Sequence, residues 1–164
     1  MIIIGIDPGA SGGIAVWGNG LTTMKKCPNN VDDMSEIVNN AKNTGYIENH
    51  NICAYIEQVH AFPTDARSAA FKFGVNYGKW LGILGVHKIK TVMVSPQKWQ
   101  KYWQRRLEIK FPKEKVKRKR RIKEIASHYT DKQVTLYVAD AILIALYGLS
   151  EEGSDIVSQE IKSK

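Results

Sequence analysis

Three acidic side chains interrupt the most hydrophobic segments of the chain. Asp7 follows the apolar residues 2–6, Glu57 ends a second apolar run, and Asp140 is the one charge within residues 137–147. A carboxylate in such a segment is costly unless it is paired, hydrogen-bonded or bound to a metal ion. Hard divalent cations prefer oxygen ligands, and a pair of them can activate water and stabilise the leaving oxygen of a phosphodiester. The three acids therefore indicate a metal site suited to phosphodiester hydrolysis.

Positive charge is concentrated between residues 110 and 123, where nine Lys and Arg residues stand against one acid, Glu114. The whole chain of 164 residues has 24 Lys and Arg against 16 Asp and Glu, a formal charge of +8 and a sequence pI of about 9.5. This balance favours a polyanionic partner and makes the run a candidate phosphate-binding surface. A solvated basic face or a mobile arm is the alternative. Together with the acids, the run favours contact with DNA.

The first acid lies at the end of a predicted antiparallel unit. Residues 2–6 have the β-branched, non-alternating composition of a strand buried on both faces. Residues 13–17 and 21–26 are predicted to form two more strands, joined by the tight hairpin signal Gly18-Asn19-Gly20. Asp7 either caps the turn after the first strand or holds a cation there.

A helical crossover is predicted to bring the second acid next to the first. Apolar residues recur at helical spacing over residues 31–42, where Asn30 can act as the N-cap. A strand over residues 52–59 that is reached through a helix is most easily added parallel to the first strand. Glu57 then lies beside Asp7.

The second half of the chain is predicted to be mostly helical. A long helix over residues 61–85 contains a glycine at every fourth position from 74 to 82, which suggests the close approach of another backbone; a bent or frayed helix is the alternative. The remaining predicted elements are a fifth strand over residues 88–94, a short helix from Ser95-Pro96, a basic helix with Pro112 in its first turn, and a helix over residues 137–147.

Length and composition indicate one domain that is large enough to fold without disulfides or a structural metal ion. Residues 1–149 are expected to form this domain and residues 150–164 a polar, mobile tail. Cys27 and Cys53 lack the spacing of a zinc site or a disulfide framework, so we expect reduced thiols. No apolar run approaches the roughly 18 residues of a membrane span, and a signal-peptide pattern is absent. We therefore expect a cytoplasmic protein without a membrane partner.

Four motifs follow one another along residues 2–149. They read Ile4-Gly-Ile-Asp7-Pro-Gly-Ala-Ser-Gly12, Tyr55-Ile-Glu57-Gln-Val, Val94-Ser-Pro-Gln-Lys-Trp99 and Val138-Ala-Asp140-Ala-Ile-Leu-Ile-Ala-Leu. In order and spacing they resemble the RuvC family of Holliday junction resolvases, especially its phage and poxvirus-like branch.

The resemblance implies an α/β, RNase H-like fold, with a five-stranded mixed sheet whose first three strands are antiparallel and whose faces are flanked by helices. It also implies a homodimer that depends on Mg²⁺, with Mn²⁺ able to substitute, and that uses no small-molecule cofactor. The implied substrates are four-way junctions and other branched DNA such as Y-forks, which receive paired symmetric nicks. A phage-encoded member would act in the cytoplasm of its bacterial host.

The resemblance assigns catalytic and metal-binding roles to Asp7, Glu57 and Asp140. The family has a fourth acid three residues before the last one, and this chain has Tyr137 there. A phenol is neutral at pH 7 and a poor magnesium ligand. Three interpretations follow: a slow natural site, replacement by another acid such as Asp131, or an inactivated variant that binds without cutting. The alternative for Asp131, which the sequence favours, is an ordinary loop residue without a catalytic role.

Other family positions carry basic or flat side chains. Lys101 and Lys115 match the two active-site lysines. His60 stands where bacterial members place an aromatic residue, with Phe62 beyond it, and either could stack on an unpaired base or be merely structural. The complete set of expected DNA-binding residues is His60, Phe62, Lys98, Lys113, Lys117, Arg118, Arg120 and Arg121.

Two other functional classes compete with a nuclease. An actin-like ATPase or sugar kinase also places Gly-x-Asp-x-Gly after its first strand, but it needs two such domains, for which 164 residues leave no room. The segment from Gly9 to Gly12 also lacks the lysine of a P-loop and the spacing of a dinucleotide-binding motif. A non-catalytic binder of branched DNA remains the alternative, because of Tyr137.

Overall fold

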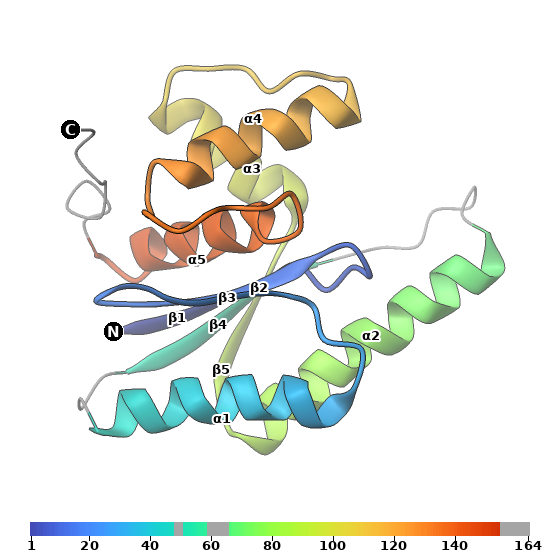
Figure 1. The fold of residues 1–164 in the computed structure, drawn as a ribbon, viewed down its shortest axis with the longest axis vertical. Coiled ribbons are helices and arrows are strands. Elements are labelled where there is room, and N and C mark those ends of the chain that lie inside the picture. Colours follow the sequence, from blue (N-terminus) through green and yellow to red (C-terminus); the bar gives the residue numbers. More distant parts are fainter. Residues whose placement is uncertain (48–50, 59–65, 155–164) are drawn as a thin grey trace.

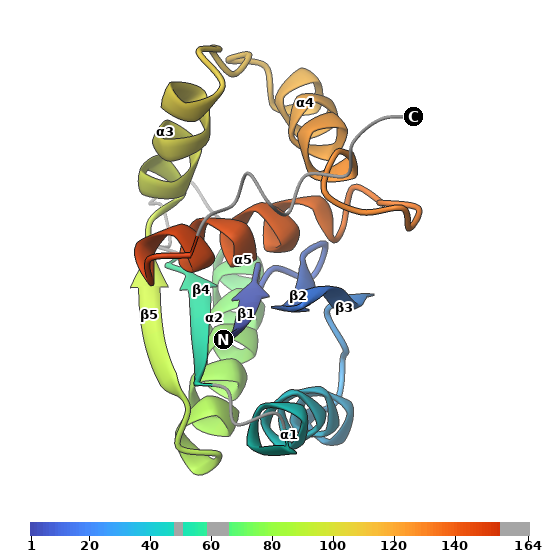
Figure 2. The same cartoon turned by 90° about the vertical axis from the view of Figure 1, so that its left-hand side faces the viewer.

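A computed structural model describes residues 1–47, 51–58 and 66–154, and within them a single mixed sheet lies between two layers of helices (Figure 1). The strands are β1 (Ile2–Ile6), β2 (Gly13–Gly18), β3 (Gly20–Lys26), β4 (Ile52–Glu57) and β5 (Lys90–Val94). The helices are α1 (Val31–Ile47), α2 (Arg67–Val86), α3 (Pro96–Arg106), α4 (Lys115–Ser127) and α5 (Ala139–Glu151). Helices α1 and α2 cover one face, and α5 crosses the other beneath α3 and α4 (Figure 2).

The central strand of the sheet is β1, in the order β3-β2-β1-β4-β5. It pairs antiparallel with β2 and parallel with β4, and β4 pairs parallel with β5. All five residues of β1 are buried, because helices cover both faces and strands cover both edges. The predicted five-stranded mixed sheet, with its first three strands antiparallel, is confirmed.

Alternate residues of β1 enter two different hydrophobic cores. Ile2, Ile4 and Ile6 pack with α1 and α2, whereas Ile3 belongs to the core under α5. Gly5 also faces α5, since a Cβ there would lie 2.6 Å from the backbone nitrogen of Ala145 and closer still to the carbonyl oxygen of Ala141. The absence of a side chain lets α5 lie directly on the central strand. This contact brings the first turn of α5 to the carboxyl end of β1.

Several predicted helix ends are wrong by two to five residues. Helix α1 continues to Ile47 through Gly45, which is buried and costs only about 1 kcal/mol in a helix interior. Helix α4 begins at Lys115, so Pro112 lies in the preceding loop rather than in the first turn. Helix α5 begins at Ala139 and runs to Glu151, two residues past the expected domain boundary.

The predicted N-cap Asn30 is confirmed, and Ser95 forms a second cap at the predicted start of α3. The backbone N–H of Asp33 donates to the Asn30 side chain at 2.7 Å at the start of α1. The Ser95 hydroxyl accepts from the backbone N–H of Lys98 at 3.3 Å, with Pro96 in the first turn of α3. Each cap satisfies a backbone donor that the helix leaves unpaired.

The glycine edge of α2 does not receive another backbone from within the described part of the chain. A Cβ added at Gly74, Gly78 or Gly82 would meet no described atom within 4 Å. The helix is nevertheless continuous from Arg67 to Val86, with Phe71 73% exposed near its beginning. The expected close approach of another backbone to these glycines is therefore wrong within the described part of this chain.

None of the described helices has the length and apolar character needed to cross a membrane.

We expect the two kinds of glycine to respond oppositely to alanine. Gly5→Ala should lower the free energy of unfolding by about 1–3 kcal/mol, because the new Cβ meets helix backbone that cannot rotate away. Gly78→Ala should raise it by up to about 1 kcal/mol, because the site is open and alanine favours helix. Urea unfolding of both variants measures the difference. Equal effects would contradict the direct contact between β1 and α5.

Candidate active site at the carboxyl ends of β1 and β4

Asp7 is held rigidly by its own loop. It follows β1 directly, is 8% exposed, and accepts a hydrogen bond at Oδ1 from the backbone N–H of Gly9 at 3.1 Å. The Cys27 thiol donates to the Asp7 carbonyl oxygen at 3.1 Å. A Cβ on Gly12 would lie 2.6 Å from the Asp7 carboxyl carbon, so the loop wraps closely around the side chain. Asn76 of α2 donates to the carbonyl of Pro8 and ties this loop to the helix.

Glu57 is oriented by a tryptophan from the next helix. It is the last residue of β4 and pairs with Val94 at the end of β5. Trp99 is fully buried on α3, and its Nε1 donates to Glu57 Oε1 at 2.8 Å. The Ser95 cap begins α3 immediately after β5, which places Trp99 one turn into the helix. The parallel pairing of β1 with β4 then sets Glu57 beside Asp7, as predicted.

Asp140 lies on α5 and approaches Asp7 and Glu57 from the face of the sheet that α5 covers. It lies in the first turn of α5, where the helix dipole favours negative charge, and is 8% exposed. Its Oδ2 atom forms an ion pair with Nζ of Lys119 on α4, at 3.3 Å. Lys119 is partly buried. It belongs to the basic run but was not among the predicted site residues.

Burial raises the pKa of all three acids, and charge repulsion adds to the shift of two of them. Burial first, and then the Asp140 charge, raise the pKa of Asp7 to about 6. Burial, and then the Asp7 charge, raise the pKa of Glu57 to about 8. Burial also raises the pKa of Asp140, although Lys119 opposes that shift. The structure therefore gathers three carboxyl groups that cannot all ionise easily without a cation.

Lys119 is the cation that the described structure holds beside these acids. Its burial works against its charge, but Asp140, Asp7 and Glu57 together raise its pKa. Among the described residues, no three acidic, His or Cys side chains surround a point closely enough to form a ready-made metal cage. The oxygen donors nevertheless have the chemistry that Mg²⁺ prefers, and their mutual repulsion favours a divalent ion. The three acids thus have ligand chemistry suited to Mg²⁺, although the described side chains are not arranged as a three-ligand metal site.

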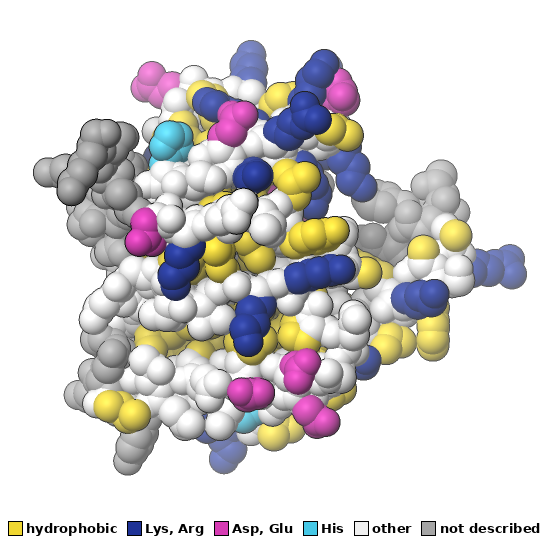
Figure 3. All heavy atoms as spheres, in the orientation of Figure 1, with side chains coloured by type: hydrophobic (Ala, Val, Ile, Leu, Met, Phe, Trp, Pro, Cys, Tyr) yellow, Lys and Arg dark blue, Asp and Glu magenta, His cyan; other side chains and the backbone are white. Residues whose placement is uncertain are grey.

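The other predicted residues of α4 spread around the helix. Arg118 is partly buried, and its charge lowers the pKa of Asp140. Lys115 is exposed one turn before Lys119, on the same side of α4. The predicted residues that are exposed on α4 or just before it are Lys113, Lys117, Arg120 and Arg121. In Figure 3 Lys and Arg side chains stand out over the upper part of the molecule, where α4 lies, with acidic side chains among them.

Lys98 and Lys101 are not brought to the acids. Trp99 points from α3 toward Glu57, whereas Lys98 and Lys101 line a separate pocket with Glu151, at the other end of α5. Lys98 pairs with Glu151 at 3.5 Å. The placement therefore gives no support to the catalytic role expected for Lys101. The predicted base-stacking residues His60 and Phe62 lie outside the described residues.

Tyr137, at the position of the family's fourth acid, lies beside a lysine of β3. It precedes α5 in a turn and is 44% exposed, and the Lys26 ammonium lies 4.8 Å from the centre of its ring. This arrangement is a cation–π contact. Asp131, the suggested substitute acid, is exposed. Neither residue forms an ion pair with Asp140, which pairs with Lys119.

Sequence comparisons returned no match, either among protein-family models or among curated proteins. The structure of Thermus thermophilus RuvC in complex with a Holliday junction substrate is similar, with a TM-score of 0.59 at 15% identity over 94% of this chain and 97% of that chain. A second Thermus thermophilus RuvC structure gives 0.58 at 16% identity over 94% and 98%. The yeast mitochondrial Holliday junction resolvase Ydc2 gives 0.45 at 13% identity over 87% and 75%. The RuvC likeness confirms the predicted RNase H-like fold.

The raised pKa of Glu57 predicts a pH dependence of stability in the metal-free protein. The folded state keeps this proton up to about pH 8, whereas the unfolded chain releases it near 4.5. The folded state therefore binds more protons between these values, and stability falls as the pH rises through them. Glu57→Gln has no such proton and keeps an oxygen that accepts from Trp99. From pH 5 to pH 8 its unfolding free energy should gain roughly 3–4 kcal/mol on the wild type.

Urea unfolding in a chelator, repeated across this pH range, measures the effect. The exposed residue Glu36 on α1 supplies the matched control, and Glu36→Gln should follow the wild-type curve. A Glu57→Gln curve that also runs parallel to the wild type would show that Glu57 is not buried among like charges.

Proposed function

We propose that this protein is a structure-selective endonuclease that resolves Holliday junctions and other branched DNA by metal-dependent hydrolysis of phosphodiesters. The observation that carries the proposal is the meeting of Asp7, Glu57 and Asp140 beside the basic helix α4, with Lys119 reaching into them. The likeness in fold to Thermus thermophilus RuvC, whose structure contains a Holliday junction substrate, supports the choice of DNA.

In the proposed reaction Asp7, Glu57 and Asp140 would hold Mg²⁺, with Mn²⁺ able to substitute. A divalent ion supplies an activated water and stabilises charge on the phosphate oxygens. Trp99 keeps one oxygen of Glu57 engaged, which fixes the direction of the carboxylate. Before DNA binds, the Lys119 ammonium partly neutralises Asp140. After DNA binds, the same ammonium can pair with a phosphate oxygen.

Exposed basic residues of α4 would bind the phosphates next to the cut. These contacts depend on charge rather than on base sequence, so they suit a substrate that is recognised by its shape. Paired nicks in two strands require two such sites, which we assign to a homodimer. The exposed glycine edge of α2 and Phe71 offer a surface for the second copy. On the basis of the four sequence motifs, the proposal also includes membership of the phage and poxvirus-like branch of the resolvases. Such a protein would act in the cytoplasm.

A binder that cuts weakly or not at all is the second candidate function. Tyr137 favours it, since the ring is engaged by Lys26 and offers no carboxylate to a second metal ion. Such a protein would still use the basic helix to hold branched DNA. The two candidates differ in one observable, the appearance of nicks.

Cleavage of labelled DNA distinguishes the candidates. With Mg²⁺ or Mn²⁺, the wild type should nick a four-way junction at opposing strands and leave a linear duplex of the same sequence intact. Asp7→Asn should lower the cutting rate by roughly a hundredfold or more, because metal-based charge stabilisation is worth several kcal/mol. Its junction affinity should remain within about twofold, because the phosphate-binding residues are untouched.

Asp32→Asn is the matched control, since Asp32 is an exposed acid on α1, in the helix layer on the other face of the sheet, and this variant should cut normally. Retention of the junction by the wild type without nicks would instead support the binder. Equal binding of junction and linear duplex, with no nicks, would contradict both candidates.

A further inference from the structure

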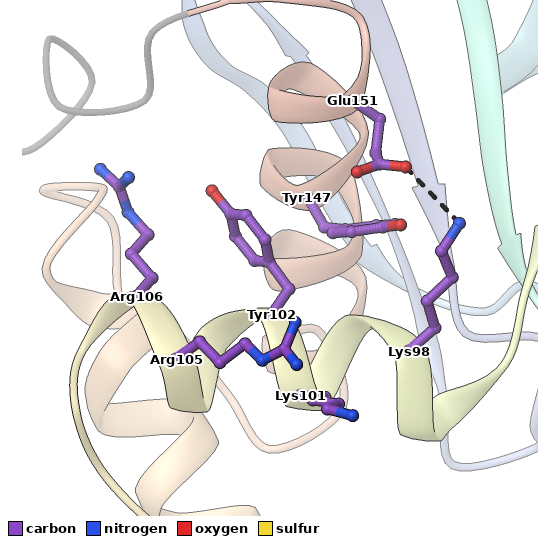
Figure 4. A pocket seen from close by; sticks show the side chains of 7 residues that line it. All are labelled: Lys98, Lys101, Tyr102, Arg105, Arg106, Tyr147 and Glu151. Carbon is purple, nitrogen blue, oxygen red and sulfur yellow. Dashed lines mark ion pairs between the residues drawn. The ribbon is translucent and has the colours of Figure 1, made fainter.

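A second polar pocket lies between α3 and the last turns of α5 (Figure 4). It has a volume of about 570 Å³ and is lined by Lys98, Lys101, Tyr102, Arg105, Arg106, Tyr147 and Glu151. Residues 140 and 151 of α5 are eleven positions apart, which is roughly 16 Å at about 1.5 Å per residue. The pocket is thus separate from the three acids, and the proposed nuclease chemistry does not use it.

The pocket has a strong excess of positive charge. Four of its lining residues are Lys or Arg and one is an acid. Lys98, Lys101 and Arg105 stand at the i, i+3 and i+7 positions of α3, so their side chains share one side of the helix. Glu151 pairs with Lys98 alone, across 3.5 Å, as the dashed line in Figure 4 marks. An anion entering the pocket would therefore meet a net attraction.

The buried hydroxyl of Tyr147 lies at the end of this pocket that Lys98 and Glu151 line (Figure 4). Tyr147 is 2% exposed, and its ring packs edge-on against those of Tyr55 and Tyr102. Its hydroxyl lies near Lys98 and Glu151 but forms no hydrogen bond of acceptable geometry with either. Burial raises the pKa of Tyr147, so the phenol stays protonated and able to donate at neutral pH. A buried polar group left unpaired costs free energy, which a bound acceptor would recover.

We propose that this pocket binds the phosphate group of a nucleotide, with the Tyr147 hydroxyl and the Lys101 and Arg105 side chains donating to its oxygens. Lys and Arg bind phosphate through charge-assisted hydrogen bonds. The volume lies within the roughly 300–1,000 Å³ of small-molecule pockets, which admits a whole nucleotide. The flat ring of Tyr102 can lie against a base or sugar. The nucleotide comes either from solution or from a DNA strand, and both sources share this chemistry.

Calorimetric titration of the full chain in a chelator tests the proposal without any cutting. The two probes are ADP, for a free nucleotide, and a twelve-nucleotide single strand without terminal phosphates. The wild type should bind at least one of them, and the probe that binds identifies the source. Tyr147→Phe, which removes only the hydroxyl, should weaken that binding by about tenfold, the equivalent of one lost hydrogen bond to a charged group.

Lys101→Glu should weaken binding by tenfold or more. Lys42→Glu is its matched control, because Lys42 is exposed on α1, across the sheet, and the change in net charge is identical. Near-ultraviolet circular dichroism shows whether each variant keeps the native packing. The proposal is overturned if the wild type binds neither probe, if Tyr147→Phe binds like the wild type, or if Lys42→Glu and Lys101→Glu lose affinity equally. Since no metal is present, these outcomes are independent of nuclease activity.

Discussion

The burial of three carboxyl groups at one site is the constraint on which this structure depends. Asp7, Glu57 and Asp140 come from two strands and a helix that are far apart in the sequence, and burial raises the pKa of each. A fold that only needed stability would separate such groups or replace them with apolar residues. Here a lysine offsets part of the repulsion. The remaining cost is understandable if the site serves to bind a cation, as strained and perturbed groups often serve function.

The scaffold holds the acids through contacts that allow little movement. Gly5 lets α5 rest on the central strand and so sets the position of Asp140. Gly12 closes the loop around Asp7, and the buried Trp99 fixes Glu57. These supports lie in the sheet and in packed helices rather than in free loops. Such support is what preorganised charge at an active site requires.

Much of this fold could be predicted from local patterns, because they coincide with the tertiary structure. The uninterrupted β-branched run of β1 reports burial on both faces, and the acids at the ends of two parallel strands had to share an edge of the sheet. Helix ends were less predictable. Gly45 is a local signal for a helix end and Pro112 for a helix start, but α1 continues through the buried Gly45 and α4 begins three residues after Pro112.

The lysines show where sequence reasoning stops. Lys101 and Lys119 both belong to basic helices, and no local property distinguishes them. The direction in which each side chain points depends on how α3 and α4 pack on α5, which is a tertiary property. Helical spacing offered one usable signal, since Lys119 lies one turn after the expected Lys115 on the same side of α4. The glycines of α2 predicted the close approach of another backbone, but no described residue of this chain lies against them.

Titration of the protein with Mn²⁺ at pH 7.5, followed by calorimetry in two buffers of different ionisation enthalpy, tests the central claim most directly. If the three acids converge to bind a cation, Mn²⁺ should bind with release of protons, because two of the pKa values lie at about 6 and 8 before the ion enters. Asp140→Asn should lose most of this affinity. Absence of Mn²⁺ binding, or binding that Asp140→Asn leaves unchanged, would contradict the account.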